Sequence, residues 1–183
     1  MKQVKIVLDT SVFVNPDSNR YFGENPRKAL INFLDSIEDK KHISCYIPPS
    51  VYEELLNFTE KLLPTKKTLL INKKPPSSYE SGVPARLVYE FIEEIRLRIN
   101  KGLRIAEKYS RQNNGEESIK TLRQEYRVAM REGVIDSKED FDLILLAKEL
   151  GAYLATADFG LVTWAQKLGI TCISAEELKE LIA

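Results

Sequence analysis

The stretch that decides the fold is residues 4–11, VKIVLDTS, an apolar run that ends in an acid and two hydroxyl residues. Residues 4–8 have the length and composition of a buried β-strand, so Asp9 follows directly at its carboxyl end. The next apolar residues, within 26–38, recur at helical spacing and predict a helix. A strand followed by a helix is the repeating unit of α/β proteins, whose ligands bind beyond the carboxyl ends of the strands.

The same alternation continues along the chain, with an interruption in its middle. The apolar patterns and their glycine and serine boundaries predict a strand at 43–47, a helix at 51–58, a helix at 138–150, a strand at 153–156, a helix at 161–168, a strand at 170–173 and a helix at 175–182. Strands that alternate with helices in this way predict an α/β fold, with a central parallel sheet covered by helices on both faces.

The middle of the chain departs from this pattern in two segments. Residues 61–84 contain four prolines and two pairs of lysines, which predicts an extended, solvated connection. Residues 85–131 predict a helical hairpin inserted into a domain formed by 1–84 and 132–183. Its first helix carries an apolar stripe, which packs either within one chain or against another, at Val88, Phe91, Ile92, Ile95, Ile99, Leu103 and Ala106.

Composition excludes several classes of protein. The 183 residues are 43% hydrophobic and include no apolar run of the roughly 18 residues that a membrane span needs. The amino terminus runs into a strand without the pattern of a signal peptide, so we expect a cytoplasmic protein without membrane contact. Cys45 and Cys172 lie in short β-like runs without a nearby histidine, which argues against a zinc site and favours reduced, buried thiols over a disulfide or a reactive thiol. With His42 as the only histidine, a Ser-His-Asp triad is improbable.

The formal net charge of zero conceals a basic hairpin. Residues 86–131 hold eleven Lys or Arg against seven Asp or Glu, an excess of four positive charges. A row of guanidinium groups at one-turn intervals suits successive phosphates of an RNA backbone, although a solvated helix face is an alternative. The basic residues form one stripe on each helix, at Arg98, Lys101, Arg104, Lys108 and Arg111 on the first and at Lys120, Arg123, Arg127 and Arg131 on the second.

Acidic residues gather at the ends of predicted strands and at one helix start. Asp9 and Asp158 each follow a strand, and residues 136–142, DSKEDFD, place four acids before a buried helix. Glu54 is a weaker candidate in the first turns of the helix at 51–58. Taken singly, Asp9 also suits a turn, and acids at a helix start also serve as caps. Four acids in seven residues exceed what capping needs.

Carboxylates that converge without His or Cys suit hard cations, so we expect Mg²⁺, with Mn²⁺ able to substitute. Such a site predicts phosphodiester hydrolysis, with a 5′ phosphate and a 3′ hydroxyl as products. The hydroxyl groups of Thr10, Ser11 and Thr156 are expected to donate hydrogen bonds that orient these carboxylates.

Taken in order, VLDTS at 7–11, Glu54, Asp142 ahead of an apolar helix, and Asp158 two residues after Thr156 resemble the PIN-domain nuclease pattern. Within that class, residues 91–107, FIEEIRLRINKGLRIAE, and 136–142 resemble the small protein-only ribonuclease P enzymes called HARP. The resemblance runs nearly end to end.

This resemblance implies a PIN-like α/β/α sandwich that removes the 5′ leader from precursor tRNA with metal but without an RNA subunit. It implies a large homo-oligomer, a dodecamer in that family, assembled through the hairpin. By position, Asp9, Asp140, Asp142 and Asp158 become the metal-binding catalytic acids, Asp136 a further catalytic candidate and Glu54, Ser11 and Thr156 supporting residues. Arg123 and Arg127 match hairpin positions expected to contact RNA, and the basic stripes add Arg131, Lys120, Arg98 and Arg104 to the expected contacts.

Two rival functions stay open at this point. A toxin-like PIN ribonuclease would cleave mature tRNA or mRNA, for which the long hairpin is surplus. A non-catalytic RNA-binding or assembly partner would use the same acids as helix caps only.

Overall fold

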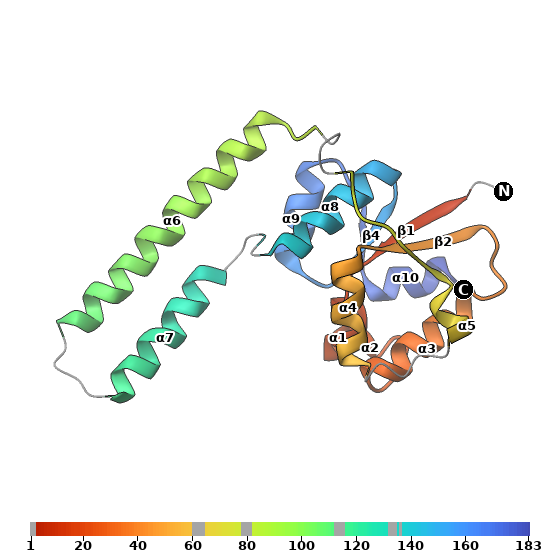
Figure 1. Ribbon diagram of the computed structural model, residues 1–183, viewed down its shortest axis with the longest axis horizontal. Helices are drawn as coiled ribbons and strands as arrows, with labels where there is room; N and C mark the ends of the chain where they lie inside the picture. Colours follow the sequence, from red (N-terminus) through yellow and green to blue (C-terminus); the bar gives the residue numbers. More distant parts are fainter. Residues whose placement is uncertain (1–2, 60–64, 78–81, 112–115, 132–134, 136) are drawn as a thin grey trace. The chain divides into compact units, whose positions relative to one another are not determined.

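The computed structural model describes residues 3–59, 65–77, 82–111, 116–131, 135 and 137–183. The chain divides into two compact units, one formed by Met1–Ser81 with Ser137–Ala183 and the other by Gly82–Asp136. The first unit is built of strands and helices, and the second is a pair of helices (Figure 1). In the described residues, no helix is both long enough and apolar enough to span a membrane.

A five-stranded parallel sheet forms the centre of the first unit. Each strand pairs in parallel with its neighbours, in the order β3-β2-β1-β4-β5. The central strand β1 is buried from Ile6 to Leu8, as its apolar run predicts. The strands are β1 (Val4–Leu8), β2 (Ile43–Ile47), β3 (Ile71–Lys73), β4 (Tyr153–Ala155) and β5 (Cys172–Ile173).

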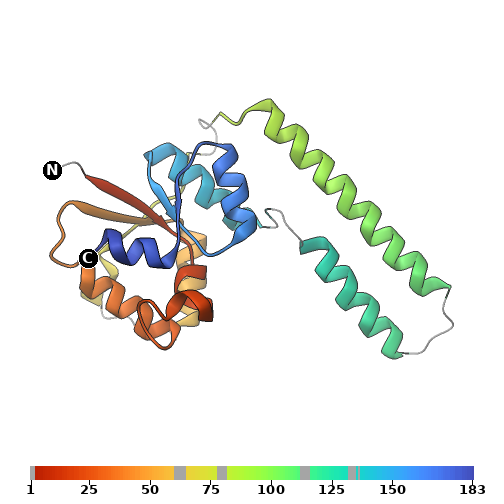
Figure 2. The ribbon, with the colours of Figure 1, turned by 180° about the vertical axis from the view of Figure 1, so that it is seen from behind.

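Helices cover both faces of this sheet (Figures 1 and 2). Right-handed crossovers that run from β1 toward β3 must lie on one face, and those that run from β4 toward β5 must lie on the other. Accordingly α3 packs with α1 and α5, whereas α8 packs with α9, β1 and β4. The α/β/α sandwich that the sequence predicts is confirmed. Its helices are α1 (Ser11–Val14), α2 (Pro16–Asn19), α3 (Pro26–Ile37), α4 (Pro49–Phe58), α5 (Thr65–Thr68), α8 (Lys138–Leu150), α9 (Phe159–Lys167) and α10 (Ala175–Leu181).

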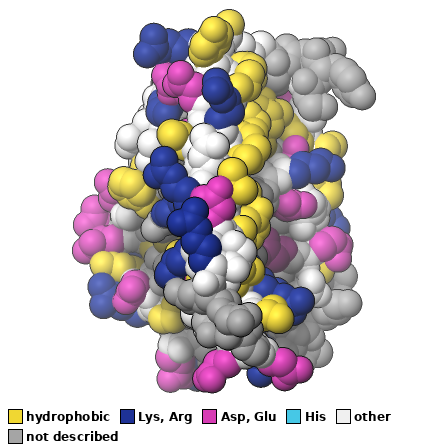
Figure 3. Space-filling view, turned by 90° about the vertical axis from the view of Figure 1, so that its left-hand side faces the viewer, with side chains coloured by type: hydrophobic (Ala, Val, Ile, Leu, Met, Phe, Trp, Pro, Cys, Tyr) yellow, Lys and Arg dark blue, Asp and Glu magenta, His cyan; other side chains and the backbone are white. Residues whose placement is uncertain are grey.

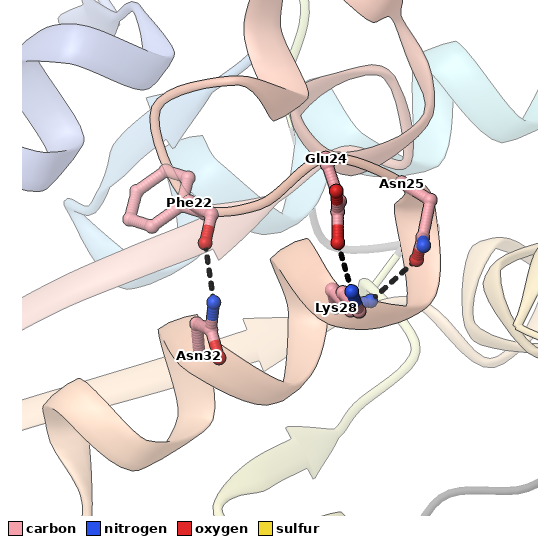
Figure 4. A network of polar contacts seen from close by, with 5 residues as sticks. All are labelled: Phe22, Glu24, Asn25, Lys28 and Asn32. Atoms are coloured by element: carbon pink, nitrogen blue, oxygen red, sulfur yellow. Dashed lines mark hydrogen bonds and ion pairs between the residues drawn. The ribbon is translucent and has the colours of Figure 1, made fainter.

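Local signals account for the ends of the helices. Asn25 caps α3 by accepting a 2.9 Å hydrogen bond from the amide of Lys28, whose side chain also pairs with Glu24 (Figure 4). In the same region the side chain of Asn32 donates to the carbonyl of Phe22 at 2.7 Å, which ties the helix to the segment before it. The predicted bounds of α8 are confirmed, because Gly151 ends it with a left-handed φ of 58°.

The prediction for residues 61–84 was wrong in part. Within the described residues of this segment the chain forms the helix α5 and the strand β3, where an extended, solvated connection was expected. Ile71 pairs with Cys45 at the edge of the sheet and is buried, so pairing with β2 gives the strand its place. The short helices α1 and α2 were also absent from the prediction.

The cysteines are both free thiols, as predicted, but they differ in burial. Cys45 is buried on β2, and this burial raises the pKa of its thiol to about 12. Cys172 on β5 is half-buried, and the pKa of its thiol is also raised by burial. Neither thiol therefore has the lowered pKa of a reactive cysteine.

The second unit consists of the helices α6 (Ala85–Ser110) and α7 (Glu116–Arg131), which pack against each other. The two helices approach each other closely at Gly102, where an added Cβ atom would lie 2.7 Å from Cε2 of Tyr126. Nearer the ends that the turn joins, Glu125 accepts hydrogen bonds from Tyr109 at 2.8 Å and from Lys108 at 3.1 Å. The hairpin that the sequence predicts is thus held by one close contact and one polar cluster.

We predict that Gly102→Leu weakens the hairpin by about 1–3 kcal/mol, because its side chain has no room beside Tyr126. Gly102→Ala should be nearly neutral, since a small shift of the tyrosine ring is offset by about 1 kcal/mol of helix propensity. Hydrogen exchange of the α7 amides measures the effect. The exposed position Asn100 on the same helix gives the matched control Asn100→Leu. Equal protection in Gly102→Leu and wild type would contradict the close contact.

Candidate active site

Asp9 lies where the strand order of the sheet reverses. The chain leaves β1 for β2 on one side, and β4 pairs with β1 on the other, so the carboxyl ends of β1 and β4 form the switch point of the sheet. The amide of Asp9 donates a 3.0 Å hydrogen bond to the carbonyl of Ala155, which fixes Asp9 beside the end of β4. The topology therefore places this acid at the position where open α/β sheets bind ligands.

Two hydroxyl groups hold the carboxylate of Asp9. Thr156 Oγ1 donates to Asp9 Oδ2 at 2.6 Å, and Ser11 Oγ donates to the same oxygen. The two hydroxyl oxygens are 3.3 Å apart, and the amide of Ala157 donates to Ser11 Oγ at 2.9 Å. Thr10 is less important, since its hydroxyl lies 3.5 Å from Asp9 Oδ1. The roles expected of Ser11 and Thr156 thus have a geometric basis in the structure.

Asp158 joins this arrangement through the same threonine. Its amide donates to Thr156 Oγ1 at 3.0 Å, so one hydroxyl connects the two acids. Its carboxylate oxygen Oδ1 accepts from the amide of Leu161 at 2.9 Å and caps α9. The helix begins at Phe159, two residues before the predicted start, because this cap precedes it.

Glu54 of α4 interacts with Asp9, and acids of α8 interact with one another and with Glu54. Burial raises the pKa of Glu54, and the charges of Asp9 and Glu139 raise it further. Burial also raises the pKa of Asp142, which Lys138 lowers and Glu139 raises. Glu54 is therefore repelled by both Asp9 and Glu139, and Glu139 also repels Asp142.

The first turn of α8 supplies the remaining predicted acids. Ser137 caps the helix by accepting a 3.0 Å hydrogen bond from the amide of Asp140, which is half-buried. Asp136 lies outside the described residues. Sequence reasoning passed over Glu139, because an acid in the first turn of a helix is already explained by the helix dipole. Its one signal was membership in the dense acidic segment 136–142.

Among the residues that the structure describes, no positive group contributes to the pKa shift of the buried Asp9 carboxylate. The residue is 7% exposed, and burial is the largest cause of its raised pKa. The hydrogen bonds from Ser11 and Thr156 lower the pKa, and the charge of Asp158 raises it. A buried carboxylate is costly without a neutralising charge, so this position favours the binding of a cation.

The donor set suits a hard cation that keeps part of its water shell. Within the described part of the chain, no three acidic, histidine or cysteine residues are grouped closely enough to enclose an ion. Mg²⁺ does not need such a cage, because it usually binds one or two carboxylates together with water and substrate phosphate. Asp9 and Asp158 are the two carboxylates that could meet that smaller requirement, because they lie at adjacent strand ends and the charge of Asp158 raises the pKa of Asp9.

The basic residues proposed for RNA contact lie in the hairpin unit. Lys120, Arg123 and Arg127 are exposed and share one face of α7, since they are separated by three and four residues. Arg104 on α6 is also exposed, whereas Arg98 is half-buried. The side chain of Arg131 lies outside what the structure describes.

Comparisons with known proteins identify a family model and relatives that this chain matches. The family model described as PINc domain ribonuclease matches residues 5–183. A protein of Thermodesulfovibrio yellowstonii named RNA-free ribonuclease P is 50% identical, over 99% of this chain and 94% of its own length. A protein of Pyrococcus abyssi with the same name is 47% identical, over 98% of this chain and 91% of its own. A PilT N-terminus domain protein of Sulfolobus solfataricus, of known structure, aligns with a TM-score of 0.43 at 14% identity, over 98% of this chain and 93% of its own.

Proposed function

The chain belongs to the PINc-domain ribonucleases and, among them, to the RNA-free ribonuclease P family, and we propose that it removes the 5′ leader from precursor tRNA by metal-dependent hydrolysis. The observation that carries this proposal is the buried carboxylate of Asp9 at the reversal point of the sheet. It is held by two hydroxyl groups, and no positive group of the described residues contributes to its pKa shift. The relatives' shared name supplies the substrate class.

Each residue of the site has its own role in the proposed reaction. Asp9 and Asp158 would hold a divalent ion, which we take to be Mg²⁺ with Mn²⁺ able to replace it, and Asp140 and Asp142 would complete the acidic set. When bound, the ion would neutralise charge on the scissile phosphate and promote attack by water, which leaves a 5′ phosphate and a 3′ hydroxyl. Thr156 and Ser11 keep the Asp9 carboxylate in one orientation, and Glu54 and Glu139 add negative charge that strengthens cation binding.

The hairpin would bind the RNA backbone. The exposed cations Lys120, Arg123 and Arg127 face solvent at one-turn intervals, which suits successive phosphates. Lys108 is a weaker candidate, because it pairs with Glu125 at 3.1 Å. The proposed contacts also include Arg98, Arg104 and Arg131.

The same hairpin would join copies of the chain. The apolar stripe that the sequence predicts on α6 stays exposed within one chain, for example at Ile92, Ile99 and Leu103, which are 52%, 56% and 56% exposed. In Figure 3, which turns the hairpin toward the viewer, hydrophobic side chains form a nearly continuous line beside a group of Lys and Arg. An apolar surface of this extent is typical of a protein–protein interface. We therefore propose a homo-oligomer, with twelve subunits by the resemblance to HARP, acting on its substrate in the cytoplasm.

Cleavage of precursor tRNA by nuclease-treated, repurified protein tests the function. We expect a released leader with a 3′ hydroxyl and a tRNA with a 5′ phosphate in Mg²⁺, and no cleavage in EDTA. A chain that cuts mature tRNA or mRNA and leaves the leader in place would be a toxin-like ribonuclease. A chain that binds precursor tRNA but leaves it intact in Mg²⁺ and in Mn²⁺ would be a non-catalytic partner. Either result would overturn the proposal.

A further inference from the structure

Phe159 is the most exposed of the large hydrophobic side chains described in the structure, at 81%. It is the first residue of α9 and directly follows Asp158, so its Cα lies about 3.8 Å from that of the proposed metal-binding acid. A phenylalanine at a helix start has no capping or packing role when its ring faces water. The ring therefore lies beside the active-site edge of the sheet without a structural function of its own.

The backbone that carries this ring is fixed on both sides. The amide of Asp158 donates to Thr156 Oγ1 at 3.0 Å, and its carbonyl accepts from the amide of Val162 at 3.0 Å. The carbonyl of Phe159 itself accepts from Thr163 Oγ1 at 2.8 Å. The same hydrogen-bond network continues through Thr156 to Asp9, so the backbone that carries the ring has a fixed position relative to the acids.

An exposed aromatic face is a suitable platform for an unpaired nucleobase. Stacking on a Phe, Tyr or Trp side chain is the usual way in which proteins hold single-stranded RNA, and it tolerates any base. A base inside a duplex has both faces covered by its neighbours, whereas an unpaired base on the leader side of the cleavage site can offer a face to the ring. Because Phe159 directly follows Asp158, a base that stacks on its ring would belong to a nucleotide next to the scissile phosphate.

We propose that Phe159 is a positioning residue that stacks on the unpaired leader nucleobase next to the scissile phosphate. This inference rests on the proposed function, because it assumes a precursor tRNA at the Asp9 site. The stack would fix the last leader nucleotide and thereby align the scissile phosphate with the acids, whichever base is present. Its contribution to binding and alignment is expected to be about tenfold, in the range measured for base–aromatic stacking.

Another exposed aromatic residue of the same unit provides a matched control. Phe58 is 47% exposed and ends α4, a helix that begins at the carboxyl edge of the sheet and runs about 13 Å along its axis. Phe58→Ala therefore removes an exposed ring from the end of α4 that lies away from the carboxyl edge of the sheet. Phe159→Ala removes an exposed ring from the start of α9, which lies at that edge.

Single-turnover cleavage of precursor tRNA with a normal or an abasic last leader nucleotide tests the stack. We expect Phe159→Ala to cleave the normal substrate about tenfold more slowly, Phe159→Trp to match wild type, and Phe58→Ala to be unchanged. Wild type should cleave the abasic substrate about tenfold more slowly than the normal one. Phe159→Ala should cleave both substrates at the same rate. The stack would be overturned if the rate decreases caused by Phe159→Ala and by the abasic nucleotide multiplied when the two were combined. An unchanged cleavage rate in Phe159→Ala would also overturn it. A loss that accompanies a changed oligomer size would assign the ring to a subunit contact and overturn it too.

A binding measurement separates this inference from the proposed function. The fluorescent base 2-aminopurine at the last leader position should be quenched when bound by Asp9→Asn, and quenched less when bound by Asp9→Asn/Phe159→Ala. Wild type that releases no leader overturns the proposed function, whatever the fluorescence shows. Equal fluorescence with both variants overturns the stack, whether or not wild type cleaves.

Discussion

Asp9→Asn is expected to abolish leader removal and, at the same time, to stabilise the metal-free protein. The cleavage rate should fall at least about a thousandfold, because a neutral amide no longer provides the charge that holds the cation. The free energy of unfolding at pH 7 should rise by about 1–2 kcal/mol, because the substitution removes a buried charge that no positive group of the described residues is shown to offset. The amide oxygen can still accept the hydrogen bonds of Ser11 and Thr156.

The raised pKa of Asp9 determines how the stability difference between Asp9→Asn and wild type changes with pH. Burial raises the pKa of Asp9 in the folded protein above the ordinary value of 3.8, so the folded state binds the proton more tightly than the unfolded state does. The stability difference between Asp9→Asn and wild type should be largest above the folded pKa. It should shrink as pH falls through that pKa and vanish below about 3.8. Denaturant unfolding in EDTA across this range measures it, with the exposed acid Asp39→Asn as control. A variant no more stable than wild type at pH 7 contradicts the unpaired charge.

Thr156→Val should lower kcat about 10- to 100-fold and leave KM for precursor tRNA little changed. The valine keeps the shape but removes the hydroxyl that donates to Asp9 at 2.6 Å and accepts from the amide of Asp158 at 3.0 Å. Loss of a group that orients a metal-binding residue has effects of this size. Single-turnover and steady-state kinetics separate kcat from KM.

Two further variants make the test of Thr156 specific. Thr156→Ser restores the hydroxyl and should recover activity to within a few-fold of wild type. Thr10→Val removes a neighbouring buried hydroxyl that lies at the 3.5 Å limit from Asp9 and should have little effect. If Thr10→Val and Thr156→Val lowered kcat equally, the link between the two acids would not be the cause.

Elements with strong local patterns were predictable from the sequence. The strand that precedes Asp9 contains the apolar run from Ile6 to Leu8, and α8 has an apolar face, a serine cap and a terminal glycine. The strand β3 was missed, because three residues among lysines and prolines have no periodicity to detect. Its register, with Cys45 opposite Ile71, depends on β2, which is distant in the sequence. The strand β3 therefore forms because it pairs with β2, which is distant in the sequence.

The candidate site shows the same division between local and distant information. Asp9 and Asp158 were identifiable, because each follows a strand and parallel strands end at one edge of the sheet. The link between them through Thr156 joins residues 147 positions apart, so its geometry required the fold. The part played by Glu139 likewise depends on α4 bringing Glu54 near α8. Sequence patterns identified the elements that supply the acids, and tertiary structure determined which acids act on one another.

The most direct test of the account is cleavage of a precursor tRNA with one sulfur in place of a non-bridging oxygen at the phosphate between leader and tRNA. Mg²⁺ binds sulfur poorly and Mn²⁺ binds it better, so the ion at the scissile phosphate determines the rate. We predict that the sulfur slows leader release by wild type at least about tenfold in Mg²⁺ and that Mn²⁺ largely restores it. Equal rates for both substrates in Mg²⁺, or leader release in EDTA, would contradict a metal-dependent site at Asp9.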